Sequence, residues 1–173
     1  MLRIPSPFGE DFNFYERTWG IANYENKTVL DIGADVGSTA DYFLQKGAKK
    51  VIAVEGSEYY WSKLCDNCLN YKFSFFHVEP VLLNIKSPED YKYLIQKYLP
   101  DIVKIDCEGC EVHLLDLDKD TVKLVREYII EVHSTELVEK FKAFFRGCNY
   151  SIIQEIFHPG NSSVKIILWA RND

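Results

Sequence analysis

The sequence predicts an α/β fold in which a mostly parallel sheet is covered by helices on both faces. Short apolar segments alternate with segments of helical periodicity along the chain. The apolar segments are continuous, as expected for parallel strands buried on both faces. A length of 173 residues suits one domain with a substantial core and is short for two. We therefore expect a single domain over 1–173, with an irregular or helical lead-in over 1–27.

Each element has a local signal. Strands are predicted at Thr28–Ile32, Val51–Glu55, Phe73–Val78, Asp101–Asp106 and Glu127–His133, and a final antiparallel pair at Tyr150–Phe157 and Val164–Ala170. Helices are predicted at Ser38–Lys46, Ser57–Leu69, Ser87–Tyr98, Glu111–Leu115 and Glu136–Phe145. Ser57, Ser87 and Ser134 suit N-cap positions, and Pro88 suits a first helical position.

Composition and charge narrow the classes of function. Hydrophobic residues make up 47% of the chain and charged residues 27%, which is typical of soluble globular proteins. The net charge of −6 repels phosphate, so nucleic acid is not the favoured partner. No segment has the roughly 18 apolar residues of a membrane span, and the N-terminus lacks the features of a signal peptide. We expect a cytoplasmic protein with no membrane partner.

Ligands of such sheets bind beyond the carboxyl ends of the strands, where acidic residues gather in this chain. Gly33 and Gly37 enclose the turn after the first strand, and Glu55 ends the second strand, where a carboxylate can accept the hydroxyls of a ribose. Asp31 and Asp35 beside the turn would repel the pyrophosphate of a dinucleotide. They suit S-adenosylmethionine (SAM), which carries a sulfonium and an ammonium group and no phosphate.

Four segments resemble the FkbM family of class I SAM-dependent methyltransferases. They are Val29–Gly37 (VLDIGADVG), Glu55–Glu58 with the later Leu64, Asn67 and Asn70, Lys104–Glu111 (KIDCEGCE), and Ile129–His133. The third segment is the most specific for the family, and the resemblance covers about residues 27–171. Asp35 replaces a usual Asn, and Gly56 replaces the first Pro of the family motif.

The resemblance implies a Rossmann-like class I methyltransferase fold, a three-layer αβα sandwich whose seven strands run in the order 3-2-1-4-5-7-6 with an antiparallel C-terminal hairpin. It implies SAM as cofactor and methyl transfer to an oxygen of a small molecule or sugar. Asp31, Gly33, Ala34 and Gly37 would hold the methionine end, Glu55 the ribose, and Glu79, Pro80 and Val81 after the third strand the adenine. The complete predicted cofactor set is Asp31, Ile32, Gly33, Ala34, Asp35, Gly37, Ser38, Glu55, Gly56, Ser57, Glu79, Pro80, Val81 and Asp106.

The ends of the fourth and fifth strands carry the predicted catalytic residues, Asp106, Glu108 and His133. Lys104 and Asp106 face the same side of a strand, so the buried lysine must pair with Asp106 or with Glu131 on the next strand. Asp106 and Glu108 can orient an acceptor hydroxyl or act as a base. His133, with an ordinary pKa near 6.5, also suits the role of base.

The state of the cysteines and the class of function both have alternatives to the main prediction. The five cysteines are an odd number without a secretion signal, so no disulfide framework is expected. The pairs Cys65/Cys68 and Cys107/Cys110 have the spacing of a four-thiolate zinc site, but the first pair falls in a predicted helix. We predict no metal and treat these residues as small buried hydrophobic groups; an intracellular disulfide is the alternative if the source is a thermophile. An RNA (tRNA) methyltransferase and a non-catalytic SAM-binding module are the alternative functions, with a nucleotide-dependent oxidoreductase and a zinc-stabilised domain as further rivals.

Overall fold

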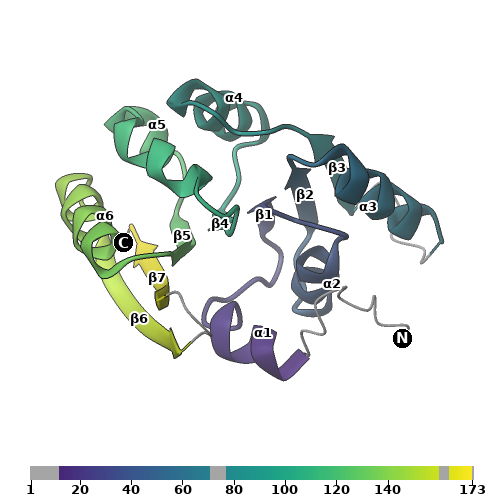
Figure 1. The fold of residues 1–173 in the computed structure, drawn as a ribbon, viewed down its shortest axis with the longest axis horizontal. Helices are drawn as coiled ribbons and strands as arrows, with labels where there is room; N and C mark the ends of the chain where they lie inside the picture. Colours follow the sequence, from purple (N-terminus) through teal and green to yellow (C-terminus); the bar gives the residue numbers. More distant parts are fainter. Residues whose placement is uncertain (1–11, 71–76, 160–163, 173) are drawn as a thin grey trace. The chain divides into compact units, whose positions relative to one another are not determined.

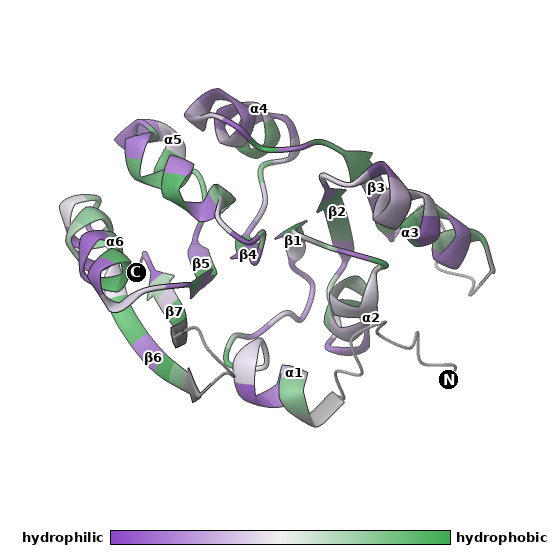
Figure 2. Cartoon of the chain, viewed as in Figure 1, coloured by the Kyte–Doolittle hydropathy of each residue, from purple (hydrophilic) through white to green (hydrophobic). Residues whose placement is uncertain are grey.

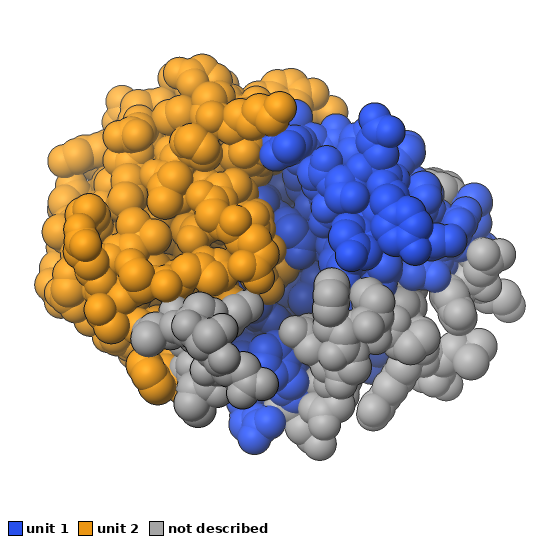
Figure 3. Space-filling view, in the orientation of Figure 1, with its two compact units in different colours: residues 1–84 blue, residues 85–173 orange. Residues whose placement is uncertain are grey.

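The computed structural model describes residues 12–70, 77–159 and 164–172. The chain divides into two compact units, 1–84 and 85–173, which Figure 3 shows in blue and orange. The seven strands have the sheet order β3-β2-β1-β4-β5-β7-β6 (Figure 1), which confirms the predicted strand order. The expectation of a single domain stays a prediction.

The first unit holds three parallel strands and three described helices. The strands are β1 (Thr28–Ile32), β2 (Lys50–Glu55) and β3 (Val78–Leu82), and the helices are α1 (Phe12–Thr18), α2 (Ser38–Gln45) and α3 (Glu58–Asn70). Leu30 pairs with Ile52, and Ala53 pairs with Pro80. The interior of β2 is fully buried and hydrophobic (Figure 2), as the continuous apolar pattern predicted.

The third strand was predicted too early in the chain. The segment Phe73–Val78 was expected to form it, but β3 begins at Val78 and continues through Pro80 to Leu82; residues 73–76 lie outside the described residues. A proline argues against a central strand, but β3 is an edge strand of the sheet, where the missing N–H is tolerated. Glu79, Pro80 and Val81 are therefore strand residues and do not follow the strand.

The second unit combines a parallel pair with the antiparallel C-terminal hairpin. Its strands are β4 (Ile102–Ile105), β5 (Glu127–Val132), β6 (Ser151–Pro159) and β7 (Val164–Arg171). β4 and β5 are parallel, and β7 runs antiparallel to both β5 and β6, as predicted. The helices are α4 (Pro88–Tyr98), the four-residue α5 (Lys119–Val122), α6 (Thr135–Gly147) and a 3-10 helix, η1 (Cys110–Asp116). The short helix predicted at Glu111–Leu115 is this 3-10 helix, and α5 was not predicted.

Aromatic side chains form much of the core of the second unit. The rings of Tyr128 and Phe145 are 5.2 Å apart, and those of Tyr128 and Tyr150 are 5.7 Å apart. All three side chains are buried, so α6 is packed through Phe145 against β5. Among the described residues, no helix is both long and apolar enough to cross a membrane. The cytoplasmic location stays a prediction.

We expect Asp90→Ala to lower the free energy of unfolding by about 1 kcal/mol. The Asp90 carboxylate accepts the backbone N–H groups of Lys86 and Ser87, at 2.9 and 3.0 Å, and completes the capping box of α4. Glu89→Ala is the matched control, because Glu89 lies in the same first turn and favours the same helix end by charge alone. Urea unfolding of both variants measures the difference; equal losses would contradict a specific role for the cap.

Candidate functional site

The loop after β1 requires glycine at two positions. Gly33 and Gly37 have φ values of 77° and 96°, in the left-handed region that favours glycine. A Cβ added to Gly37 would lie 2.7 Å from Leu64 Cδ1 of α3. The N–H groups of Gly33 and Ala34 both donate to the carbonyl of Val54 at 3.0 Å. These contacts hold the start of the loop against β2.

Glu55 joins this loop to the start of α3. One carboxylate oxygen accepts the backbone N–H of Asp35 at 2.9 Å, and the other accepts the N–H of Ser57 at 2.7 Å. Each carboxylate oxygen has a second lone pair, so the half-buried Glu55 can accept further hydrogen bonds. The structure thus brings together two features that the sequence placed on separate strands. The contact of Glu55 with a ribose stays a prediction.

Two supporting residues were missed by the sequence reasoning. The Thr39 hydroxyl donates a 2.6 Å hydrogen bond to Asp31, whose side chain is fully buried. The Asn67 amide donates to the carbonyl of Val36 at 2.8 Å and so ties α3 to the glycine loop. Asn67 belongs to a motif segment quoted above, which was the available signal. Thr39 carried no signal, because its partner lies on another element.

The residues of this loop fit SAM. Ser38 Oγ is buried and has no hydrogen-bond partner within the described part of the chain, so a ligand can supply one. The carboxylates of Asp31, Asp35 and Glu55 in this region favour a cationic ligand over a phosphate. Ile32 is buried and contributes to the core beneath the loop.

The three predicted adenine-flanking residues lie within β3: Glu79 and Pro80 in its first half, and Val81 near its carboxyl end opposite Val54. The contact of these residues with adenine stays a prediction. Glu79 pairs with Ile52 and forms a 2.6 Å ion pair with Lys50, the first residue of β2. It therefore lies near the amino end of the strand, while ligands bind at the carboxyl ends. Leu83 and Asn84 follow β3 instead. Leu83 N–H donates to the carbonyl of Glu55 at 3.0 Å.

Gly56 allows a close approach at the same place. A Cβ on Gly56 would lie 3.2 Å from Asn84 Cα, which is closer than about nine in ten real Cβ contacts. A glycine at this position therefore has a local reason. The segment after β3 passes directly beside the residue that follows Glu55.

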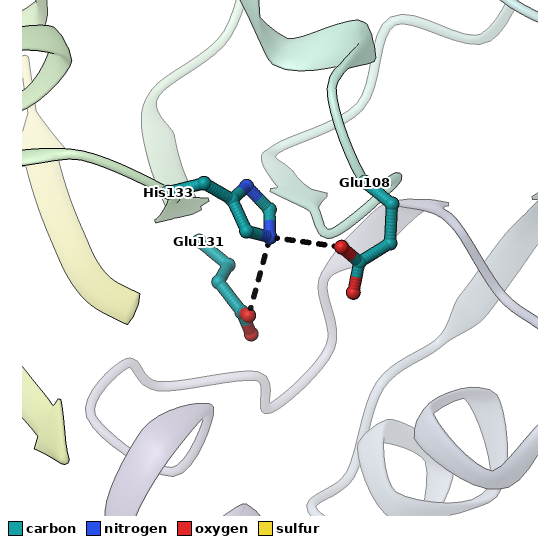
Figure 4. A group of neighbouring side chains, drawn as sticks. All are labelled: Glu108, Glu131 and His133. Carbon is teal, nitrogen blue, oxygen red and sulfur yellow. Dashed lines mark ion pairs between the residues drawn. The ribbon is translucent and has the colours of Figure 1, made fainter. Parts of the chain in front are cut away.

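The second unit carries a separate cluster of Glu108, Glu131 and His133 (Figure 4). His133 follows β5, Glu131 lies within β5, and Glu108 lies in the loop after β4. His133 Nε2 is 3.3 Å from a Glu108 oxygen and 3.6 Å from a Glu131 oxygen. Glu131 is buried and Glu108 is exposed. Two of the three predicted catalytic residues are thus brought together, with Glu131 as an additional member.

Glu111 orients the imidazole of His133 and was missed as a site residue. Its side chain is 2% exposed, and one oxygen lies 2.8 Å from His133 Nδ1. The other oxygen accepts the backbone N–H of Gly109 at 2.8 Å. A carboxylate at Nδ1 favours the tautomer with the proton on Nδ1, which leaves a lone pair on Nε2.

The carboxylates around His133 change its pKa. Burial lowers the pKa of His133, but the hydrogen bond to Glu111 and the negative charges of Glu111, Glu108 and Glu131 together outweigh it. The net result is a pKa raised above 6.5.

Asp106 and Lys104 are the two other charged residues that the sequence predicted near this site. Asp106 is half-buried just after β4, and no ion pair joins it to the Glu108–Glu131–His133 cluster among the described residues. Lys104 is completely buried in β4, as predicted. Its pairing with Glu131 or Asp106 stays a prediction.

The interpretation of the second cysteine pair was wrong. Cys107 and Cys110 form a disulfide, with Cα atoms 5.5 Å apart. The positive φ values of Glu108 and Gly109 turn the loop so that the two cysteines meet. Disulfide sulfurs are not thiolates, so a four-thiolate zinc site is excluded. Cys68 is buried as predicted, and burial raises its pKa to about 11.

Comparisons with solved structures define the class of the fold. TrmK of M. capricolum with S-adenosyl-homocysteine (SAH) has a TM-score of 0.71 and 17% identity, covering 95% of this chain and 69% of that one. Magnesium protoporphyrin IX methyltransferase (ChlM) from Synechocystis PCC 6803 with SAH has a TM-score of 0.66 and 15% identity, covering 90% and 78%. Aeropyrum pernix fibrillarin with SAM has a TM-score of 0.62 and 14% identity, covering 84% and 66%. The protein thus has the Rossmann-like fold of class I SAM-dependent methyltransferases, a seven-stranded mixed sheet.

Sequence comparison places the chain among viral relatives. It belongs to the same family as Uncharacterized protein 65 of Sulfolobus islandicus filamentous virus (isolate Iceland/Hveragerdi), to which it is 30% identical over 123 residues, 69% of this chain and 67% of the relative. Uncharacterized protein 158B of Sulfolobus islandicus rod-shaped virus 1 is 32% identical over 120 residues, covering 69% and 68%. No protein-family model matches the chain, so membership of the FkbM family stays a prediction.

We expect Thr39→Val to lower the free energy of unfolding by roughly 1–3 kcal/mol, because the buried Asp31 carboxylate loses a hydrogen bond that no water replaces. Thr39→Ser keeps the hydroxyl and is the matched control. Chemical denaturation of the two variants compares them. Equal losses in both variants would contradict the role of the hydroxyl, because Thr39→Ser keeps this group and Thr39→Val removes it.

We expect the pKa of His133 to lie above its ordinary value of 6.5, and its titration midpoint to fall in Glu111→Gln. Because its pKa is raised by folding, His133 contributes stability that is fully present below its unfolded pKa and is lost as pH rises through the folded pKa. NMR titration of the imidazole measures the midpoint, and Glu136→Gln on the exposed face of α6 is the control. A midpoint below 6.5 would show that burial outweighs the carboxylates.

Proposed function

We propose that the protein is a SAM-dependent methyltransferase that methylates an oxygen of a small molecule or sugar. The observation that carries this proposal is the carboxylate of Glu55, which accepts N–H groups from both Asp35 and Ser57. These two hydrogen bonds fix the predicted ribose-binding carboxylate directly beside the glycine loop. The fold shared with SAM- and SAH-bound proteins supports the same cofactor.

The proposed cofactor site lies in the first unit. Asp31 and the glycine loop would hold the methionine end, Glu55 would accept the ribose hydroxyls, and Leu83 and Asn84 would lie beside the adenine. The proposed set in this unit is Asp31, Ile32, Gly33, Ala34, Asp35, Gly37, Ser38, Glu55, Gly56, Ser57, Val81, Leu83 and Asn84. Asp106, also predicted from the sequence, belongs to the second unit. NAD is disfavoured, because its pyrophosphate would meet the acidic residues of the loop.

The acceptor is the second part of the proposal. When bound, SAM supplies a methyl group whose carbon bonds to the acceptor oxygen as its bond to sulfur breaks and the electron pair stays on sulfur. The protein must align the acceptor and remove its hydroxyl proton. Asp106, Glu108 and His133 are proposed for these tasks. Glu111 holds the imidazole of His133 at Nδ1, so that Nε2 remains for the acceptor side.

The charge of the second unit's cluster favours a small acceptor over RNA. Glu108, Glu111 and Glu131 are all carboxylates grouped around His133. The net charge of the whole chain is −6. Both features would oppose binding of a phosphate backbone.

We expect SAM and SAH to bind with micromolar dissociation constants, and Glu55→Gln to weaken both by roughly 10- to 100-fold, the value of a hydrogen bond to a charged group. Glu79→Gln is the matched control, because Glu79 lies in β3 and pairs with Lys50. Isothermal titration calorimetry measures the constants, with NAD as a comparison ligand. Binding of NAD in place of SAM would overturn the cofactor assignment.

Methyl transfer from labelled SAM then separates the alternatives. Labelled hydroxylated small molecules and sugars would support the proposed acceptor class. Labelled tRNA, with transfer that falls steeply as salt rises, would identify an RNA methyltransferase. SAM binding without transfer to either class would identify a non-catalytic SAM-binding module.

A further inference from the structure

We propose that Glu108, Glu131 and His133 form a binding site for a divalent transition-metal ion. The ligand atoms, one from each residue, all lie within 4.8 Å of one another. Two ligands on one ion with bonds of about 2.0–2.2 Å are themselves about 3–4 Å apart. The distances of 3.3 and 3.6 Å from His133 Nε2 to Glu108 and Glu131 meet this requirement.

The orientation of His133 supports a cation between these groups. Its Nδ1 is engaged by the buried Glu111, so the lone pair of Nε2 is directed toward two carboxylates (Figure 4). A lone pair facing carboxylates is repulsive unless a positive charge lies between them. Nε2 is buried, and among the described residues it makes ion-pair contacts with Glu108 and Glu131 but no hydrogen bond. A metal ion at this position would contact all three ligand atoms.

The contact between Glu111 and His133 has the form of a second shell of a metal site. Metal-binding histidines usually donate their other N–H to a carboxylate, which fixes the ring and increases its basicity. In this protein, His133 Nδ1 lies 2.8 Å from an oxygen of Glu111, and the other oxygen of Glu111 accepts the N–H of Gly109 at 2.8 Å. Glu111 is therefore a positioning residue for the ligand His133.

The charges closest to the imidazole favour a cation. Carboxylates of Glu108, Glu111 and Glu131 lie within 2.8–3.6 Å of its two nitrogens. Negative charges at this distance stabilise a positive charge at Nε2. One nitrogen and two oxygen ligands suit Mn²⁺ or Zn²⁺, since imidazole and carboxylate are both ligands of these ions.

The role of the ion in catalysis rests on the proposed function, but its binding does not. Exposed Glu108 places one side of the site toward solvent, where an acceptor oxygen can complete the coordination. An ion at this position lowers the pKa of a bound hydroxyl. Glu108 and His133 then act through the ion, and Asp106 remains the proposed group that takes the hydroxyl proton.

The first test is a titration of Mn²⁺ into protein that a chelator has freed of metal. The electron paramagnetic resonance signal of the unbound Mn²⁺ measures how much of the ion is bound. Mn²⁺ avoids the free thiols of Cys65, Cys68 and Cys148, which could bind zinc. We expect one site per chain. Glu108→Gln and His133→Gln should weaken binding by at least the roughly 10- to 100-fold seen for second-shell changes, and Glu111→Gln by about that amount.

Controls separate this inference from the proposed function. Glu136→Gln removes an exposed carboxylate of α6 outside the cluster and should leave binding unchanged, and exposed Glu108 can be changed without loss of core packing. Failure of both Mn²⁺ and Zn²⁺ to bind, or binding that survives Glu108→Gln and His133→Gln, would overturn the metal site. If the protein binds SAM but no metal, the metal site is wrong and the proposed function stands. If it binds metal but no SAM, the proposed function is wrong and the metal site stands.

Discussion

The candidate cofactor site depends on a single carboxylate that binds two segments of backbone. Glu55 accepts N–H groups from the glycine loop and from the start of α3, and charged acceptors make hydrogen bonds about twice as strong as neutral ones. The positive φ values of Gly33 and Gly37 let the loop turn back to the end of β2, where Val54 and Glu55 accept hydrogen bonds from its backbone. Without that carboxylate, the loop would lose a main link to the neighbouring strand.

In the other unit, a second carboxylate also accepts a backbone N–H, but its other oxygen contacts a side chain. Glu111 is buried, and its two oxygens are occupied by Gly109 N–H and His133 Nδ1. Glu55 is half-buried and has lone pairs left for a ligand, whereas Glu111 serves to orient another side chain. Burial thus separates a carboxylate that can still accept further hydrogen bonds from one that positions another side chain, although both lie near strand ends. The environment of each acid, and not its type, sets its chemistry.

Most elements were predictable because they depend on local pattern, whereas the strand order came from the family resemblance. The apolar segments at Thr28–Ile32 and Asp101–Asp106 overlie β1 and β4, and the alternation of strands and helices implies a parallel sheet. The third strand was misplaced because the apolar and aromatic segment Phe73–Val78 matched a strand pattern, while β3 begins at Val78 and continues through Pro80. The four residues of α5 are too few to show helical periodicity. These errors arise in short segments whose secondary structure depends on tertiary contacts more than on their own sequence pattern.

The sequence by itself determined which residues end β1 and β2, where glycine must occur, and that carboxylates gather at the predicted ligand edge. Only the tertiary structure decided how those residues pair. Glu111 and His133 are 22 positions apart, and Thr39 reaches Asp31 from another element. The Cys107–Cys110 disulfide depends on the turn at Glu108 and Gly109. Such contacts follow from strand register, backbone turns and burial, which bring distant side chains together and which local sequence patterns do not record.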